Sequence, residues 1–141
     1  MICAKYLMRR RAAVLPDTVA SRVVSQFSAT GLPGLAVVDK DLRVIGVITE
    51  FDILGALREG MELDAFTAER VMSKDPITAS IRTMTPDLIS MMLINHCTVI
   101  PILNKKKQFV GIVSRISIMD SYISPVYDVF RNRKEDWHTE D

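Results

Sequence analysis

Residues 42–49 read LRVIGVIT, and residues 107–114 read KQFVGIVS. Both stretches are apolar and rich in β-branched side chains, and each carries one internal glycine, Gly46 or Gly111. The two glycines stand 65 positions apart, and the flanking residues match in type at the same offset. A fixed offset between matching segments indicates an internal repeat, so we expect one structural unit to be written twice in this chain.

Each of these stretches is expected to be the second strand of a hairpin. In the first copy, residues 35–38 and 43–48 flank a short polar turn, and in the second copy residues 99–103 and 108–113 do the same. Apolar runs of this length, separated by turn-forming residues, are typical of paired antiparallel strands.

A helix is expected to follow each hairpin, beginning near Glu50 and near Arg115. In the first of these helices, Phe51, Leu54 and Leu57 recur at a spacing of three, which predicts an apolar helix face.

A further helix should precede each hairpin. In the first copy Asp17 or Thr18 is expected to cap it, and Gly31 to end it. In the second copy Thr85 is expected to be the cap, because a proline and an acidic residue follow it directly. The predicted fold is therefore α/β (α+β), with two β-α-β-β-α repeats that pack together with pseudo-two-fold symmetry.

The repeats set the expected domain boundaries. We expect a first repeat over residues 1–60, a connection over 61–67, a second repeat over 68–124 and a charged tail over 125–141.

Composition narrows the classes of function. The chain has 141 residues, a hydrophobic fraction of 48% and a formal net charge of +1, which matches an ordinary globular protein. A balanced charge argues against nucleic-acid binding, which needs a clear basic excess. No apolar run is long enough to span a membrane, and the first residues do not have the order of a secretory signal. We therefore expect a cytoplasmic protein with no membrane or nucleic-acid partner.

The two cysteines and two histidines do not suggest a metal site or a catalytic thiol. His96 and Cys97 are adjacent, and neighbours on an extended strand point to opposite faces. The sequence also offers no nucleophile–base pair and no phosphate-binding loop, so no catalytic residues are assigned and an enzyme is disfavoured.

The order of these segments resembles the tandem cystathionine-β-synthase-type (CBS) domain pair, or Bateman module, over residues 4 to about 123. The segments that carry the resemblance are LPDTV at 15–19, LAVVD at 35–39, GVITEFDIL at 46–54, VMSKDPI at 71–77, VIPIL at 99–103 and GIVS at 111–114. The resemblance implies two repeats joined in a disc, dimerisation into a larger disc, and clefts between the repeats that bind adenosine-containing ligands. AMP, ADP or ATP is favoured over S-adenosylmethionine, Mg²⁺ is compatible with bound ATP, and no cofactor is obligatory.

Thr49 and Asp52 are the central candidate ligand-binding residues. They lie where a strand passes into a helix, and the N–H groups at a helix start favour a phosphate. The Asp52 carboxylate offers two acceptor oxygens to a ribose diol, and the resemblance implies the same roles for both residues. The pattern has a second interpretation, because threonine followed three residues later by an acid is close to a capping box that merely starts a helix.

Apolar residues near this turn are expected to contact the adenine base. The full set of candidate ligand-binding residues is Thr49, Asp52, Val47, Ile48, Ala36, Val14, Ser114 and Arg115.

The second repeat departs from the family pattern at Ser117, which stands where an aspartate is expected. Serine has one oxygen and no charge, and losing a charge-assisted hydrogen bond costs about 1.5–3 kcal/mol. We therefore expect one competent cleft at Thr49 and Asp52, and a weak or empty one at Ser114 and Arg115.

Two functions follow from these observations. The first is a non-catalytic regulatory module that binds an adenine nucleotide and signals through contacts with a second copy or a regulated partner protein. The alternative is a structural dimerisation or interaction module whose ligand clefts have decayed, and Ser117 is its best support.

Overall fold

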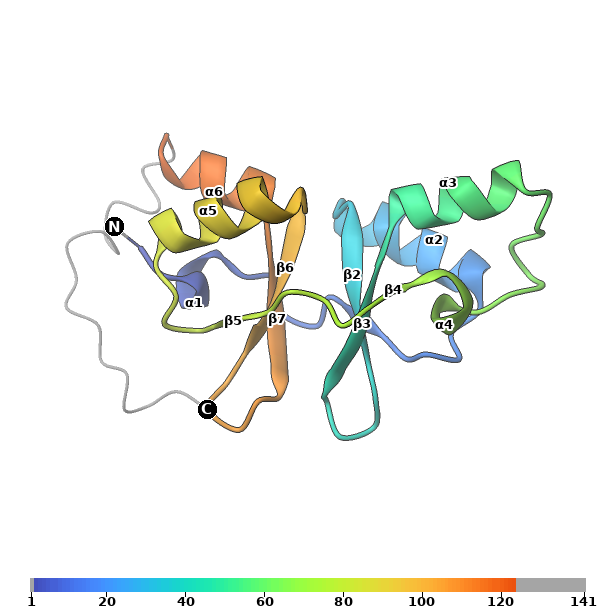
Figure 1. The fold of residues 1–141 in the computed structure, drawn as a ribbon, viewed down its shortest axis with the longest axis horizontal. Helices are drawn as coiled ribbons and strands as arrows, with labels where there is room; N and C mark the ends of the chain where they lie inside the picture. Colours follow the sequence, from blue (N-terminus) through green and yellow to red (C-terminus); the bar gives the residue numbers. More distant parts are fainter. Residues whose placement is uncertain (1, 124–141) are drawn as a thin grey trace. The chain divides into compact units, whose positions relative to one another are not determined.

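The computed structural model describes residues 2–123, and these residues form mixed α and β structure, as the repeats predicted (Figure 1). The chain divides into two compact units, each with its own small sheet. The contiguous unit is Ala12–Pro76, and the split unit joins the residues up to Arg11 with those from Ile77 onward. The charged tail expected at 125–141 lies outside the described residues.

The contiguous unit contains a four-stranded sheet in the order β1-β2-β3-β4. The first strand pairs in parallel with the second, the second pairs antiparallel with the third, and the third pairs antiparallel with the fourth. The strands are β1 (Ala13–Val14), β2 (Gly34–Val38), β3 (Val44–Thr49) and β4 (Ser73–Lys74), and the helices are α2 (Ala20–Thr30), α3 (Glu50–Arg58) and α4 (Ala68–Val71).

The split unit repeats this plan around a three-stranded sheet in the order β5-β6-β7. Arg9 adds an isolated antiparallel bridge to Ile112, at the edge that β4 occupies in the other sheet. The strands are β5 (Ala79–Ser80), β6 (Val99–Leu103) and β7 (Phe109–Ser114), and the helices are α1 (Ala4–Leu7), α5 (Thr85–Asn95) and α6 (Arg115–Ser121).

The units in space do not coincide with the repeats expected from the sequence. The short helix α1 stands at the start of the first repeat but belongs to the split unit, and α4 stands at the start of the second repeat but belongs to the contiguous unit. Each unit therefore contains the first helix of the other repeat, so residues 1–60 alone lack elements on which their own sheet packs.

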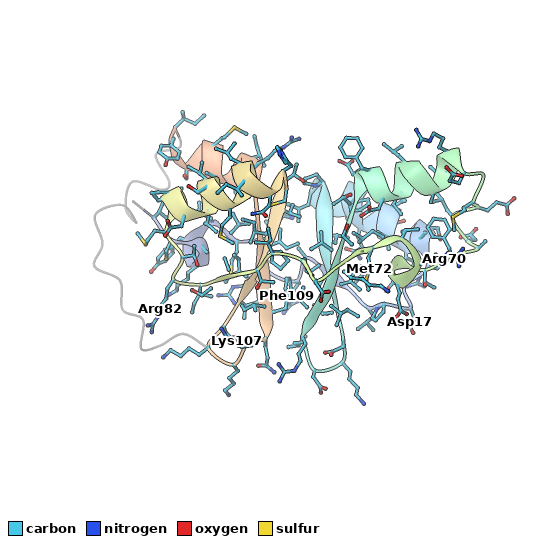
Figure 2. All side chains as sticks on the ribbon, in the orientation of Figure 1. Asp17, Arg70, Met72, Arg82, Lys107 and Phe109 are labelled. Atoms are coloured by element: carbon cyan, nitrogen blue, oxygen red, sulfur yellow. The ribbon has the colours of Figure 1, made fainter. Side chains whose placement is uncertain are left out.

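This exchange explains the internal glycines of β3 and β7. A Cβ atom on Gly46 would lie 2.5 Å from Sδ of Met72 and 2.9 Å from the carbonyl oxygen of Ser73, which follow α4 (Met72 is labelled in Figure 2). A Cβ atom on Gly111 would lie 2.9 Å from the carbonyl oxygen of Arg9, which follows α1. Only glycine lets the exchanged segment approach each strand so closely.

The expected helix caps were partly wrong. The N-cap of α2 is Val19, without a side-chain cap, because the Thr18 hydroxyl instead accepts a hydrogen bond from the N–H of Leu15 at 3.1 Å. Asp17 is not the cap either. The end of this helix is confirmed, since Gly31 is the C-cap with a φ of 70°.

Thr85 is also not a cap. Met84 is the N-cap of α5, and Thr85 is the first helical residue. Its buried hydroxyl donates to the carbonyl oxygen of Ile2, so it attaches the N-terminal segment to the split unit.

The predicted apolar face of α3 is exposed. Phe51 retains 82% of its accessible surface, and Leu54 and Leu57 are also exposed, whereas Ile53 and Ala56 are buried. A spacing of three does not distinguish the face that packs on the sheet from the face that looks outward, because both run along the helix at nearly the same period.

None of the helices between residues 2 and 123 is long and apolar enough to cross a bilayer.

Candidate functional site

Thr49 and Asp52 are brought together at the junction of β3 and α3. The Thr49 hydroxyl accepts a hydrogen bond from the N–H of Asp52 at 3.3 Å, and it donates to Oδ2 of Asp52 at 3.1 Å. The same carboxylate oxygen accepts the N–H of Thr49 at 2.8 Å. The two residues therefore form a reciprocal capping box, which satisfies two of the donors that a helix start leaves without partners.

This capping box uses half of the Asp52 carboxylate. Oδ2 receives both hydrogen bonds from Thr49, whereas Oδ1 has no hydrogen-bond partner among residues 2–123. The side chain is half-buried, so the second oxygen is held in a fixed place with part of its surface open. An ionised carboxylate oxygen in this position accepts hydrogen bonds from a ligand hydroxyl.

The start of α3 offers fewer free donors than the sequence suggested. The N–H of Glu50 donates to the carbonyl oxygen of Pro33 at 3.0 Å, and that of Asp52 donates to the Thr49 hydroxyl. Within the described part of the chain, the N–H of Phe51 is left as the first-turn donor without an acceptor. The helix dipole still favours an anion at this end of a nine-residue helix.

The apolar candidates do not form one wall. Directly opposed residues in a sheet share a face, and the register pairs Ala36 with Val47 but Val14 with Val37, the neighbour of Ala36. Val14 therefore belongs to the opposite row of side chains from Ala36 and Val47. Ala36 and Ile48 have 0% exposed surface, so only Val14 and Val47 have any surface that a ligand can touch.

A polar hollow that the sequence did not predict lies beside β1. It has a volume of about 460 Å³ and includes Val14 in its wall. The remaining lining residues are Ala13, Asp17, Thr18, Val19, Arg22 and Gln26. Arg22 and Gln26 are four residues apart on α2, so they share one face of this helix, but such a spacing alone does not predict a hollow.

At the corresponding junction in the split unit, Ser114 and Ser117 hydrogen-bond to each other. The N–H and the hydroxyl of Ser114 donate to Oγ of Ser117 at 3.2 and 3.3 Å, and the Ser117 hydroxyl donates to the Ser114 carbonyl oxygen at 2.8 Å. Ser117 has thus used its single proton and both lone pairs within the turn. Arg115 is exposed, and its N–H donates to the carbonyl oxygen of Thr98 at 2.9 Å.

His96 and Cys97 were expected on an extended strand, but they lie at the end of α5. His96 is the C-cap and has a left-handed backbone, with a φ of 52°. Burial raises the pKa of the Cys97 thiol above its ordinary value, which keeps the thiol protonated. Within the described range, no three histidine, cysteine or acidic side chains gather as a metal site.

The model of one protein family, described as CBS domain, matches the chain twice, over residues 4–59 and 68–124. A 17.7 kDa protein of Acidianus ambivalens is 31% identical over 101 residues, which are 72% of this chain and 60% of that protein. The chain spans only 19% and 20% of two longer curated relatives.

Solved structures share the fold. The CBS domain protein PAE2072 from Pyrobaculum aerophilum, complexed with AMP, has a TM-score of 0.76 at 20% identity, over 91% of this chain and 96% of that one. CBSX2 of Arabidopsis thaliana, in complex with AMP, has a TM-score of 0.73 at 16% identity, over 87% and 97% of the two chains.

Proposed function

The chain belongs to the CBS-domain family, and we propose that it is a non-catalytic regulatory module that binds an adenine nucleotide at the Thr49–Asp52 turn. The observation that carries this proposal is the state of the Asp52 carboxylate. One oxygen is held by the cap and the other has no partner among the described residues, so the positioned carboxylate has an oxygen ready to accept a hydrogen bond from a ribose hydroxyl. The AMP complexes of two proteins with this fold support the choice of ligand class.

Nucleotide binding at this turn requires an exchange of partners inside the cap. The only proton of the Thr49 hydroxyl points to Asp52, so Thr49 donates to a phosphate only after it turns away from the carboxylate. A ribose hydroxyl then takes the vacated position on Oδ2, and the bond from the Thr49 N–H keeps the carboxylate in place. The number of hydrogen bonds to Oδ2 is preserved, so the exchange does not leave a half-buried charge unsatisfied.

The ligand contributes its phosphate to the start of α3. The Phe51 N–H and the helix dipole face this end, and they favour an anion without distinguishing AMP, ADP and ATP. Bound ATP would carry Mg²⁺ on its phosphates, whereas AMP needs no metal. Binding would then bias the contacts of the module with a second copy or a regulated protein, since a ligand shifts an equilibrium only by its differential affinity for the two states.

A structural module without a ligand is the second candidate. The observation in its favour is that both helix starts carry a reciprocal capping box, in which the Ser117 hydroxyl is fully used and Asp52 keeps one oxygen without a partner among residues 2–123. This candidate predicts folding and association without any nucleotide.

Isothermal titration with AMP, ADP, ATP and S-adenosylmethionine distinguishes the two candidates. We expect saturable binding of a single nucleotide per chain, abolished by Asp52→Ala. The matched control is Asp87→Ala, which removes an acid from the first turn of α5 and should leave binding unchanged. Absence of binding to the folded parent chain would refute the nucleotide proposal and favour the structural module.

A further inference from the structure

The two units of the chain differ strongly in charge. The split unit carries nine lysine and arginine side chains against two acidic ones over residues 2–11 and 77–123, a formal charge of +7. The contiguous unit carries six basic side chains against ten acidic ones, a formal charge of −4. The total of +1 for the whole chain therefore conceals a basic unit and an acidic one. Such an asymmetry indicates a surface that meets a charged partner.

Basic side chains gather at one end of the sheet in the split unit. Strands β5 and β6 run parallel and end at Ser80 and Leu103, which pair with each other. One turn follows each strand at this end, so the two turns are neighbours. Four exposed residues occupy these turns (two of them are labelled in Figure 2), and we call them the basic end: Arg82 after β5, and Lys105, Lys106 and Lys107 after β6.

The turn after β6 has a twin after β2 in the contiguous unit. Oδ1 of Asn104 accepts hydrogen bonds from the backbone N–H groups two and four residues later, at 2.9 and 3.0 Å, and Oδ1 of Asp39 does the same at the same distances. Lys107 and Leu42 both have a left-handed backbone, with φ values of 63° and 64°. The same turn therefore forms without the three lysines.

The turn after β5 has a twin after β1. In each of these turns a threonine hydroxyl accepts the N–H of the residue three positions earlier, at 3.1 Å. Arg82 stands in one turn where Asp17 stands in the other, 65 residues earlier, and both side chains are exposed. An acid has thus been exchanged for a base while the turn is unchanged.

The twin turns differ in charge although they share a backbone. Residues 80–83 and 104–108 have a formal charge of +4 and contain no acid, whereas residues 15–18 and 39–43 contain three acids and two bases, a charge of −1. The ammonium groups of Lys105, Lys106 and Lys107 have no ion-pair partner among residues 2–123. Adjacent like charges repel, so a repulsion that the turn does not require is explained by an anion that the described residues do not supply.

The surroundings of the basic end favour one class of anion. Phe109 follows the second turn directly and is only 7% exposed, so these turns offer no ring for stacking on a nucleic-acid base. The large exposed apolar side chains of the split unit lie on α5, on α6 and directly after α6, so the lysines have no apolar neighbour in their turns that would enter a membrane. Carboxylates of a protein segment need neither feature, because a lysine ammonium group binds them as a point charge.

We propose that the basic end binds an acidic segment of a partner protein, in which several carboxylates follow one another. The contact is electrostatic and salt-dependent, since exposed charges are screened beyond about 8 Å at physiological ionic strength. The inference names the kind of regulated protein that the proposed function calls for, and in that respect it rests on that function. The basic end lies in the split unit and the Thr49–Asp52 turn in the contiguous unit, so each binding event can be measured without the other ligand.

Fluorescence anisotropy with a labelled hexaglutamate peptide, in the absence of nucleotide, tests the proposal. The parent chain should bind the peptide, and raising the salt from about 0.01 M to about 0.15 M should weaken binding about tenfold or more, because the Debye length falls from about 30 to about 8 Å. The variant K105Q/K106Q/K107Q should bind about tenfold or more weakly than the parent at the lower salt concentration. Its midpoint temperature of thermal unfolding should not fall, since the turn forms without the lysines.

A matched control separates a local site from the effect of net charge. The variant R22Q/R58Q/R70Q removes the same number of charges from exposed positions of the contiguous unit. It should change the dissociation constant of the peptide by less than about twofold, because the binding charges are those of the basic end.

Transfer of the charges should create a second site. The variant D17R/D41K/L42K raises the formal charge of the twin turns from −1 to +4 and keeps Asp39, whose side chain holds the turn. Hexaglutamate should then bind at two sites per chain, where the parent chain has one.

Three results would overturn the proposal. The first is no binding of hexaglutamate to the folded parent chain at about 0.01 M salt, where exposed charges are least screened. The second is an equal loss of binding in the lysine and arginine triple variants, which would show a response to net charge alone. The third is binding of a hexathymidine strand or of phosphatidylserine vesicles more than about tenfold tighter than hexaglutamate, lost in K105Q/K106Q/K107Q, which would assign the surface to another class of partner. Hexaglutamate binding by a chain that binds no nucleotide would support the basic end and refute the nucleotide proposal alone.

Discussion

Oδ2 of Asp52 accepts hydrogen bonds from both the backbone N–H and the hydroxyl of Thr49, at 2.8 and 3.1 Å. Oδ1 has no partner in the described part of the chain, so the two oxygens of one carboxylate have separate roles. Without a ligand, Oδ2 stabilises the start of α3 and Oδ1 is available to accept a hydrogen bond. These roles respond differently to substitution, because capping requires an acceptor and ribose binding is strengthened by charge.

Asp52→Asn should separate the two roles. The asparagine amide oxygen still accepts from Thr49, so we expect the free energy of unfolding to fall by less than about 1 kcal/mol. Nucleotide affinity should fall about tenfold or more, because the charge that strengthens the ribose hydrogen bonds is lost. Chemical denaturation and titration calorimetry measure the two effects. Equal losses of stability and binding in Asn and Ala variants would contradict the division of roles.

Ser117→Asp should create a second nucleotide-binding site, at the junction of β7 and α6. The aspartate accepts from the N–H and hydroxyl of Ser114, as Asp52 does from Thr49, and its second oxygen remains available. An acid in the first turn also suits the helix dipole, so the variant should be at least as stable as the parent. We expect the calorimetric stoichiometry to rise from one nucleotide per chain to two. A stoichiometry that stays at one would show that more than the carboxylate is missing from this junction.

Gly46→Ala should destabilise the contiguous unit. The added methyl group meets Sδ of Met72 and the carbonyl oxygen of Ser73, and the second of these is backbone that has to move. Overpacking of this kind costs about 1–3 kcal/mol. Gly55→Ala is the matched control, because a Cβ there has no neighbour within 4 Å and the residue lies inside α3. This second substitution should stabilise the chain by about 0.5–1 kcal/mol. The midpoint temperature of thermal unfolding should fall for Gly46→Ala and rise for Gly55→Ala.

The repeat, the hairpins and the Thr49–Asp52 pair were predictable from sequence because each depends on neighbours along the chain. The strands β2, β3, β6 and β7 follow from apolar runs on either side of polar turns, and they occur within one or two residues of the predicted positions. The cap at Thr49 follows from a three-residue spacing.

The features that the sequence did not predict depend on contacts between distant segments. The packing of Met72 against Gly46 requires the exchange of α1 and α4 between units, which no local pattern records. Phe51 was assigned to an apolar helix face because its apolar character is visible in the sequence, whereas the exposure of that face is not. Val14 was grouped with Ala36 because strand register is set only when β1 pairs with β2.

His96→Gly should stabilise the split unit. His96 caps α5 in the left-handed region, with a φ of 52°, and Gly31 fills the same place after α2 with a φ of 70°. Glycine adopts this conformation without the steric cost that a Cβ atom brings, so we expect a gain of about 0.5–1 kcal/mol in unfolding free energy. Gly31→Ala should show the reverse effect. Chemical denaturation of both variants checks the pair, and a loss of stability in His96→Gly would mean that the imidazole makes contacts worth more than the backbone strain.

The reactivity of the Cys97 thiol, which lines a hollow between α5 and α6, should depend on pH. Burial raises the pKa of this thiol, and the thiolate is the reactive form, so alkylation at pH 7–8 should be slower than that of a free thiol and should continue to rise above about pH 9. The folded chain holds the thiol proton more tightly than the unfolded chain, so this contribution to stability is fully present below the ordinary thiol pKa and is lost as pH rises from there through the raised pKa of the folded chain. Cys3 is fully buried and serves as the internal control, because its alkylation requires unfolding.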